Sequence, residues 1–253
     1  SAATIYGDVW TPGTVLHDVW EDVQGAPAGN LKTLAEMTYS AMMFETAWHD
    51  EDMHDYHARF PNGDYVRPDT TFDGISGWAL GLHGHVREAS TVANAAQWAA
   101  GTPGAVARAY AQDVDRDGEA EWILENDRLY AVFEDDGGRL VALFARDPLT
   151  REGYQVIGAF PVNPGESRES EWEGSTNQSQ RRVSGLKDWW STGQNTDRYV
   201  NARYSAQAVA GGLRLTSDDG RIRKTVTLAP SSNRLEVRYE TDASVGTLYV
   251  RLG

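Results

Sequence analysis

The chain has 253 residues, of which 40% are hydrophobic and 10% aromatic, so it can bury a sizeable core. Its 37 acidic residues outnumber 23 basic ones, and the formal net charge of -14 argues against nucleic acid or an anionic membrane surface as a partner. The absence of cysteine excludes disulfides, thiolate metal sites and cysteine nucleophiles, and no apolar run approaches the roughly 20 residues that span a bilayer.

The first 104 residues are predicted to form a helical segment. Gly and Pro punctuate residues 1–29, which leaves room for one short helix around 15–23. A long helix is predicted to begin at Asn30, a typical N-cap residue, and to present Glu45 and Trp48 near its C-terminal end. A second long helix is predicted from residue 73 to a Gly-Thr-Pro-Gly stop, and its alanine-rich face is expected to pack on the first.

Polar chemistry is concentrated in residues 44–57, where the first long helix runs into a loop. His49, His54 and His57 could bind a transition metal together with nearby carboxylates, although their spacings of five and three match no compact zinc motif. The acidic residues from Glu45 to Asp52 could supply a catalytic carboxylate pair, although acids this close in one loop more often form a solvated surface. Both interpretations stay open at this point.

Residues 105–253 are predicted to form a large antiparallel β-sandwich, which makes the fold class α+β, with a boundary near residue 104. Short β-branched or aromatic runs are separated by turn residues and alternate apolar with polar positions. They lie at 105–112, 120–125, 127–134, 139–146, 153–160, 199–209, 212–216, 221–229, 233–240 and 246–252. The polar segment 166–195 is expected to be a long loop or a cover over the sheet.

The strongest local motif is the run from Asp113 to Glu121, Asp-Val-Asp-Arg-Asp-Gly-Glu-Ala-Glu. Carboxylates at alternate positions, with Gly at the sixth, let a loop curl so that several oxygens converge on one hard cation. We therefore predict a structural Ca2+ site with Asp113, Asp115, Asp117 and Glu121 as ligands. Leu124 replaces the usual Glu at the twelfth position, so the loop is expected to join two strands. The alternative is an acidic surface turn.

The order of a helix, the segment Ala-Met-Met-Phe-Glu-Thr-Ala-Trp-His at 41–49, a second helix and a sandwich resembles the C-terminal half of glycoside hydrolase family 57 enzymes. These include α-amylases, amylopullulanases and 4-α-glucanotransferases. The sandwich runs at 126–130, 137–140 and 223–226 look similar to the supersandwich of this group and of mutarotase-like domains. The resemblance covers nearly all of this chain but only the half of the family that lacks the catalytic barrel.

The resemblance implies the C-terminal portion of an α-glucan-active glycosidase or glucanotransferase, which supplies a wall of the substrate cleft and a β-sandwich. Glu45, Trp48 and His49 would then contact an α-glucan. The catalytic carboxylate pair would come from a barrel in an upstream domain or a separate chain, so the isolated chain is expected to be inactive.

Two other functions compete with this one. The chain could be a non-catalytic carbohydrate-binding or cell-surface module, in which Trp189, Trp190 and Trp172 stack on a polysaccharide, although tryptophans in a sandwich are more often core residues. It could also be a small intact enzyme that uses the polar cluster of residues 45–57. The acidic composition is typical of a soluble protein in a secreted or salt-exposed setting, so a secreted or extracellular location is expected.

Overall fold

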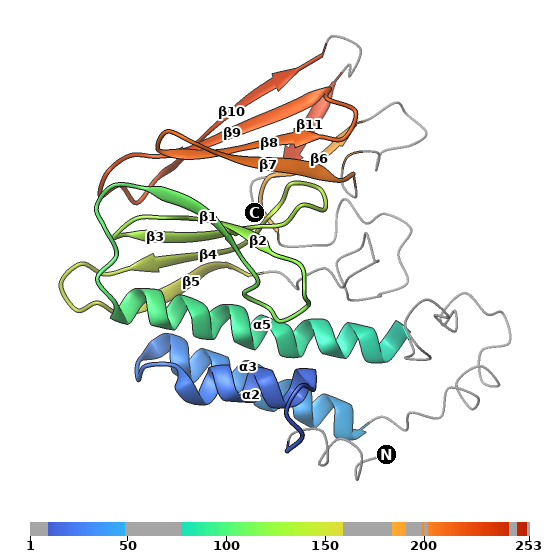
Figure 1. Cartoon of the computed structure of the whole chain (residues 1–253), viewed down its shortest axis with the longest axis vertical. Helices are drawn as coiled ribbons and strands as arrows, with labels where there is room; N and C mark the ends of the chain where they lie inside the picture. The colour runs from blue at the N-terminus through green and yellow to red at the C-terminus, as the bar shows by residue number, and fades with distance from the viewer. Residues whose placement is uncertain are drawn as a thin grey trace, which may run out of the picture.

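The computed structural model describes residues 10–48, 77–158, 184–190, 199, 202–242 and 247–251. These residues form three layers: a layer of helices, a five-stranded antiparallel sheet and a four-stranded antiparallel sheet (Figure 1). The predicted α+β class, with helices first and an antiparallel sandwich after them, is confirmed.

The helical layer contains α2 (Val15–Gly25), α3 (Asn30–Trp48) and α5 (Gly77–Ala100). The side chain of Thr14 caps α2 by accepting a hydrogen bond from the His17 amide. One face of each helix is buried at a spacing of three or four residues, with Leu16, Val19 and Val23 on α2, Leu31, Ala35 and Tyr39 on α3, and Val86, Ala89, Val92, Ala93 and Ala96 on α5. No helix among the described residues is long and apolar enough to cross a membrane.

The two long helices end largely as predicted, and α3 also begins at the predicted residue, but its cap comes from outside the helix. Asn30 is the first helical residue, and its amide donates to Oε2 of Glu152, which reaches it from a loop in the first sheet. The cap of α3 is therefore a tertiary contact, which local sequence could not reveal. Gly101 ends α5 by donating its amide to the carbonyls of Gln97 and Trp98. The predicted start of that helix, at residue 73, lies outside the described residues.

Ten of the described strands match the predicted runs. The first sheet has the order β1 (Arg108–Gln112), β2 (Glu121–Glu125), β3 (Leu129–Phe133), β4 (Leu140–Arg146) and β5 (Gly153–Gly158). The second has the order β10 (Leu235–Thr241), β9 (Ile222–Leu228), β8 (Gly212–Ser217) and β7 (Tyr204–Val209). A further strand, β6 (Lys187–Trp190), lies inside the segment 166–195, which is predicted to be a loop or a cover. It pairs with β11 (Leu248–Arg251).

The first sheet has a hydrophobic core on each of its faces. On β2, Ile123 packs towards the helices and its neighbour Leu124 packs towards the second sheet, because side chains alternate along a strand. Leu213, Leu215, Ile222 and Val226 complete the core between the sheets, as their alternation predicted. The helices and the first sheet thus share one core, and the division near residue 104 stays a prediction.

Candidate metal centre

The acidic motif forms the loop between β1 and β2, as predicted. Asp113 accepts the amides of Arg116 and Gly118, at 2.8 and 3.2 Å, and Asp115 Oδ1 accepts the amide of Asp117 at 3.1 Å. Arg116 and Gly118 have φ values of 67° and 91°, in the left-handed region that lets a loop curl tightly. These bonds hold the carboxylates on the inside of the loop.

Two overlapping groups of carboxylates meet there. Ligand atoms of Asp113, Asp115 and Asp117 lie within 4.8 Å of one another, and so do those of Asp115, Glu121 and Glu134. Asp115 belongs to both groups. The four predicted ligands are therefore close together in the structure, while their binding of Ca2+ stays a prediction.

Glu134 is the member of this cluster that the sequence did not reveal, because it lies outside the acidic motif, at the end of the predicted strand 127–134. It follows β3, whose pairing with β2 sets Trp122 opposite Phe133. One more residue along that register brings Glu134 opposite Glu121. The hairpin register of two predicted strands was the signal that could have found it, since residues opposite each other share a face.

The cluster is buried on one side only, because Asp113 is exposed and Asp117 and Glu134 are half-buried. Asp115 is 1% exposed and Glu121 is 3% exposed. Glu121 Oε2 accepts the amide of Val114 at 2.7 Å, but Asp115 Oδ2 has no hydrogen-bond partner among the described residues. A buried carboxylate oxygen without a partner is costly unless a cation or a proton satisfies it.

The pKa values follow from this burial. Burial raises the pKa of Asp115 to about 8; the charge of Asp117 adds to the effect, while the charge of Arg87 acts in the opposite direction. Burial also raises the pKa of Glu121 to about 10, with the charge of Glu134 as the next cause, and the pKa of Asp117 to about 6. Burial raises the pKa of Glu134 well above its ordinary value. A divalent cation would return these carboxyls to the ionised form.

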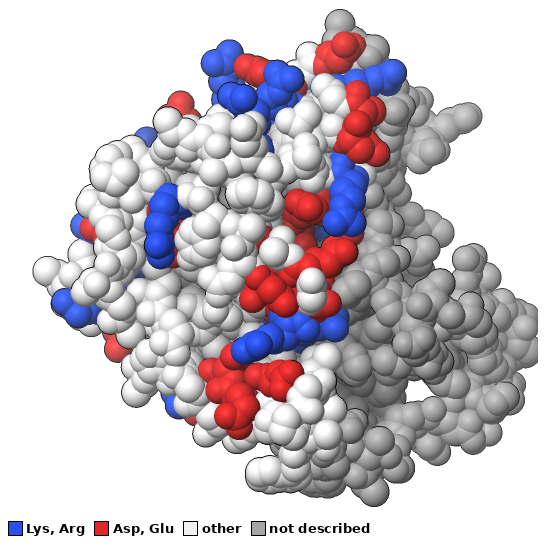
Figure 2. Space-filling model, viewed as in Figure 1, with Lys and Arg blue, Asp and Glu red and all other residues white. Residues whose placement is uncertain are grey.

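Basic side chains at the rim connect the loop to other layers. Arg116 donates through Nε and Nη2 to Asp22 of α2, at 2.8 and 2.6 Å, and Ser90 of α5 donates to the same carboxylate at 2.6 Å. Arg203 lies 3.3 Å from Glu119 on the other side. Figure 2 shows acidic side chains gathered at the middle of this face, with basic side chains beside them and a second acidic group nearer the helices.

The predicted sugar-contacting residues do not form a describable site. Glu45 and Trp48 belong to the last residues of α3, and the orientation of their side chains lies outside what the structure describes. His49, His54 and His57 lie outside the described residues, as does Trp172. Trp189 and Trp190 are on β6, where their backbones pair with Tyr249 and Leu248. These residues remain predictions.

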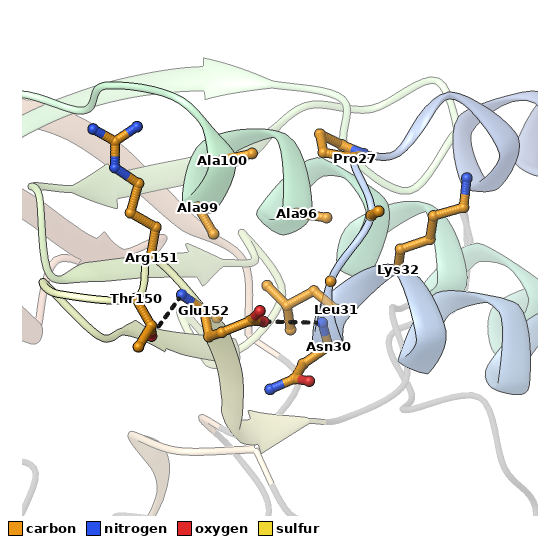
Figure 3. A pocket seen from close by; sticks show the side chains of 13 residues that line it. Pro27, Asn30, Leu31, Lys32, Ala96, Ala99, Ala100, Thr150, Arg151 and Glu152 are labelled. Atoms are coloured by element: carbon orange, nitrogen blue, oxygen red, sulfur yellow. Dashed lines mark hydrogen bonds between the residues drawn. The ribbon is translucent and has the colours of Figure 1, made fainter.

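A cavity of about 240 Å³ lies at the start of α3, between the helical layer and the loop before β5. In Figure 3 the Glu152 side chain points to the Asn30 amide at the start of the helix. The carboxylate thus already occupies the place where an anion would be attracted to the amides of the first turn. The charged side chains that line this cavity are Lys32, Arg151 and Glu152, and Glu152 already occupies the helix start, so we assign the cavity a structural role.

Comparisons with solved structures give distant likenesses. No protein family and no curated protein match the chain. The crystal structure of 4-alpha-glucanotransferase from Thermococcus litoralis aligns with 91% of this chain, at 18% sequence identity and a TM-score of 0.38. The aligned part covers 36% of that enzyme, so this chain spans about a third of its length. A likeness at this TM-score carries no argument about activity.

Proposed function

We propose that this chain is the Ca2+-stabilised C-terminal portion of an α-glucan-active glycosidase or glucanotransferase. In this proposal it supplies a wall of the substrate cleft and a β-sandwich, while a catalytic barrel in an upstream domain or another chain supplies the carboxylate pair. The observation that carries the cation part is the buried Asp115 Oδ2, which lies without a partner beside Glu121 and Glu134.

The chemistry of the cluster favours Ca2+ over other metals. The ligand groups are all carboxylates, and hard cations prefer oxygen donors. The described residues of the cluster contain no imidazole, which zinc sites typically use. Ca2+ also tolerates irregular coordination by six to eight oxygens, whereas Mg2+ demands a near-ideal octahedron. A cluster of five carboxylates in two overlapping groups fits the irregular coordination of Ca2+ better than the octahedron of Mg2+.

The glucan part of the proposal is supported by the order and packing of the described elements. The helix that ends with the Glu45–Trp48 segment lies beside α5, and both helices pack on the first sheet of the sandwich. That arrangement is the one the resemblance implies for a cleft wall followed by a sandwich. Trp48, His49 and Glu45 are the residues that we propose contact the glucan.

Affinity electrophoresis in gels containing soluble starch tests the glucan part. We expect starch to retard the wild-type chain and Trp48→Ala or His49→Ala to remove the retardation, without any glucan hydrolysis by the chain alone. Unchanged retardation of both variants would contradict the cleft wall, and measurable hydrolysis would contradict the missing carboxylate pair.

The second candidate is a secreted carbohydrate-binding or cell-surface module. It is favoured by the strand β6, which carries Trp189 and Trp190 and pairs with β11 in a two-stranded sheet. In the same gels, retardation that survives Trp48→Ala but is lost in the double variant Trp189→Ala/Trp190→Ala would select the module. Retardation that is lost in Trp48→Ala but survives in the double variant would select the cleft wall.

A further inference from the structure

A polar groove lies between α5 and the exposed edge of the first sheet. The helices cover the other part of this sheet, since α5 packs against β4 and β5 and α3 packs against β5. β1 is the edge strand and pairs only with β2 among the described strands. The space between this strand and α5 is a cavity of about 340 Å³, which is within the range of ligand pockets.

One face of α5 and one face of β1 line the groove. On α5, Asn94, Gln97 and Trp98 follow one another at the three- and four-residue spacing of a single helix face. On β1, Arg108, Tyr110 and Gln112 alternate along one face of the strand. The sequence of each element therefore presents a row of hydrogen-bonding side chains to the same space.

Glu125 holds the side chains of Arg108 and Tyr110 in position in this groove. Its side chain is buried, and its Oε1 accepts from Arg108 Nε at 2.7 Å while its Oε2 accepts the Tyr110 hydroxyl at 3.0 Å. The Arg108 guanidinium also lies 4.9 Å from the centre of the Tyr110 ring. Glu125 thereby neutralises the charge of Arg108 and holds the planes of both side chains in place.

The amide side chains are oriented in the same way. Gln112 Nε2 donates to Asn94 Oδ1 at 3.0 Å, and Asn94 Nδ2 donates to the carbonyls of Ser90 and Val114. Gln97 Nε2 donates to the Gly25 carbonyl at 2.8 Å. Within the described part of the chain, no hydrogen bond is recorded to Oε1 of Gln97 or Gln112, so these two atoms remain as acceptors.

The charges and hydrogen-bonding groups of the groove indicate which class of ligand it could bind. The ion pair between Arg108 and Glu125 is balanced and the amides are neutral, so a charged ligand gains no counter-charge there. An apolar ligand would leave amide oxygens and guanidinium N–H groups without partners, which is costly. A neutral ligand with many hydroxyl groups can donate to the amide oxygens and to the Tyr110 hydroxyl, and can accept from Arg108.

We propose that this groove is a saccharide subsite that binds one or two neutral sugar units. The choice of α-glucan as its ligand rests on the proposed function, whereas the saccharide class rests on the groove. Tyr110 and Gln112 bind the sugar, and Glu125 is a positioning residue that acts through Arg108 and Tyr110. The subsite lies on different elements from Glu45, Trp48, Trp189 and Trp190.

Titration of the 15N-labelled chain with maltotriose and with cellobiose tests the subsite, with the side-chain amide signals of Asn94, Gln97 and Gln112 as the readout. We expect these signals to shift on addition of maltotriose. Gln112→Ala and Tyr110→Phe should each raise the dissociation constant about three- to tenfold, the equivalent of one hydrogen bond. Gln207→Ala, an exposed amide on β7, is the matched control and should leave it unchanged.

The outcomes separate the subsite from the proposed function. Shifts with cellobiose but not maltotriose would support the groove and contradict the α-glucan assignment. Retardation of the chain by starch together with unshifted groove amides would overturn the groove and leave the proposed function standing. Failure of both sugars to move the groove amides, or equal affinities for wild type, Gln112→Ala and Gln207→Ala, would overturn the subsite.

Discussion

Asp115 shows how one buried side chain can indicate a ligand. Its Oδ1 is used by the loop, its Oδ2 has no partner among the described residues, and Glu121 and Glu134 face it. Carboxyls this close disfavour one another's ionisation, and the charge of Arg87 offsets only part of that effect at Asp115. The sequence predicted the loop because its alternation is local, but it missed Glu134, which reaches the cluster through strand pairing.

Glu88 carries the clearest pH dependence outside the acidic loop. It lies on α5 near Gln155 of β5, and burial raises its pKa from 4.5 to about 7, although Gln155 acts in the opposite direction. A carboxyl with a raised pKa in the folded state favours folding below its unfolded pKa. That contribution is lost as the pH rises from 4.5 through 7.

Replacing Glu88 with Gln removes this ionisation and keeps a similar shape. We expect Glu88→Gln to raise the melting temperature at pH 8 by a few degrees and to leave it nearly unchanged at pH 4.5. Glu36→Gln, the same exchange at another helical position on α3, is the control. Thermal unfolding followed by circular dichroism at both pH values makes the comparison, and an equal effect at pH 4.5 and pH 8 would contradict the burial of Glu88.

At the scale of elements, glycine sets the distance between the helical layer and the first sheet. A Cβ atom on Gly153 would clash with the buried side chain of Leu31 on α3 and would come within 3.2 Å of Ala99 on α5. Gly153 therefore lets β5 approach both helices closely. No signal in its own strand distinguishes this glycine from one that only weakens a strand.

We expect Gly153→Ala to destabilise the fold by about 1–3 kcal/mol, the usual cost of overpacking a core. Gly25→Ala provides the control, because a Cβ at that helical position meets nothing within 4 Å. Urea unfolding of the two variants measures the difference. Equal free energies of unfolding would mean that the helical layer is not packed on β5 as closely as described.

Lys224 connects three elements through one buried ammonium group. Its Nζ lies 2.6 Å from Asp188 of β6 and donates to the carbonyls of Gly138 and Leu186, at 2.7 and 2.8 Å. Tyr204 and Tyr239 donate to the same Asp188 carboxylate. This network explains why β6 escaped prediction: its polar Asp188 reads as a loop residue until a partner 36 residues later neutralises it.

Removing the ammonium leaves Asp188 buried without its counter-charge. We expect Lys224→Met to cost about 3–5 kcal/mol of unfolding free energy. Arg223→Met, which breaks an exposed pair with Glu240, should cost less than about 1 kcal/mol. Guanidinium unfolding compares the two neighbouring variants, and similar losses would contradict the buried network. Adding Asp188→Asn to Lys224→Met should restore part of the loss.

For the whole molecule, the sequence predicted the class, ten of the strands and the buried helix faces, because these depend on periodicity within one element. Alternation at Leu213 and Leu215 and the three- and four-residue spacing of Val86, Ala89 and Ala93 are local signals. The contacts that join layers were not predictable in this way. The Glu152 cap of α3, the Glu134 member of the acidic cluster and the Lys224–Asp188 pair each connect residues from different elements.

The cation centre also belongs to the scale of the whole molecule, since it touches more than one layer. The loop that carries it is bound to α2 through Arg116 and Asp22, while Glu134 follows β3 in the first sheet. A bound Ca2+ would therefore hold the helical layer, the β1–β2 loop and the sheet together. Ligand binding to the folded state alone stabilises it by mass action, so the melting temperature reports directly on the site.

Calorimetric titration of the chelator-treated chain with CaCl2, paired with its melting temperature, tests this central claim most directly. We predict saturable binding, a higher melting temperature with Ca2+, and affinities at least about tenfold weaker in Asp115→Asn and Glu134→Gln, because even changes behind a metal ligand cost 10–100-fold. Glu236→Gln, an exposed acid on β10, should bind as the wild type does. No heat of binding, together with a melting temperature that neither chelator nor millimolar Ca2+ changes, would contradict the account.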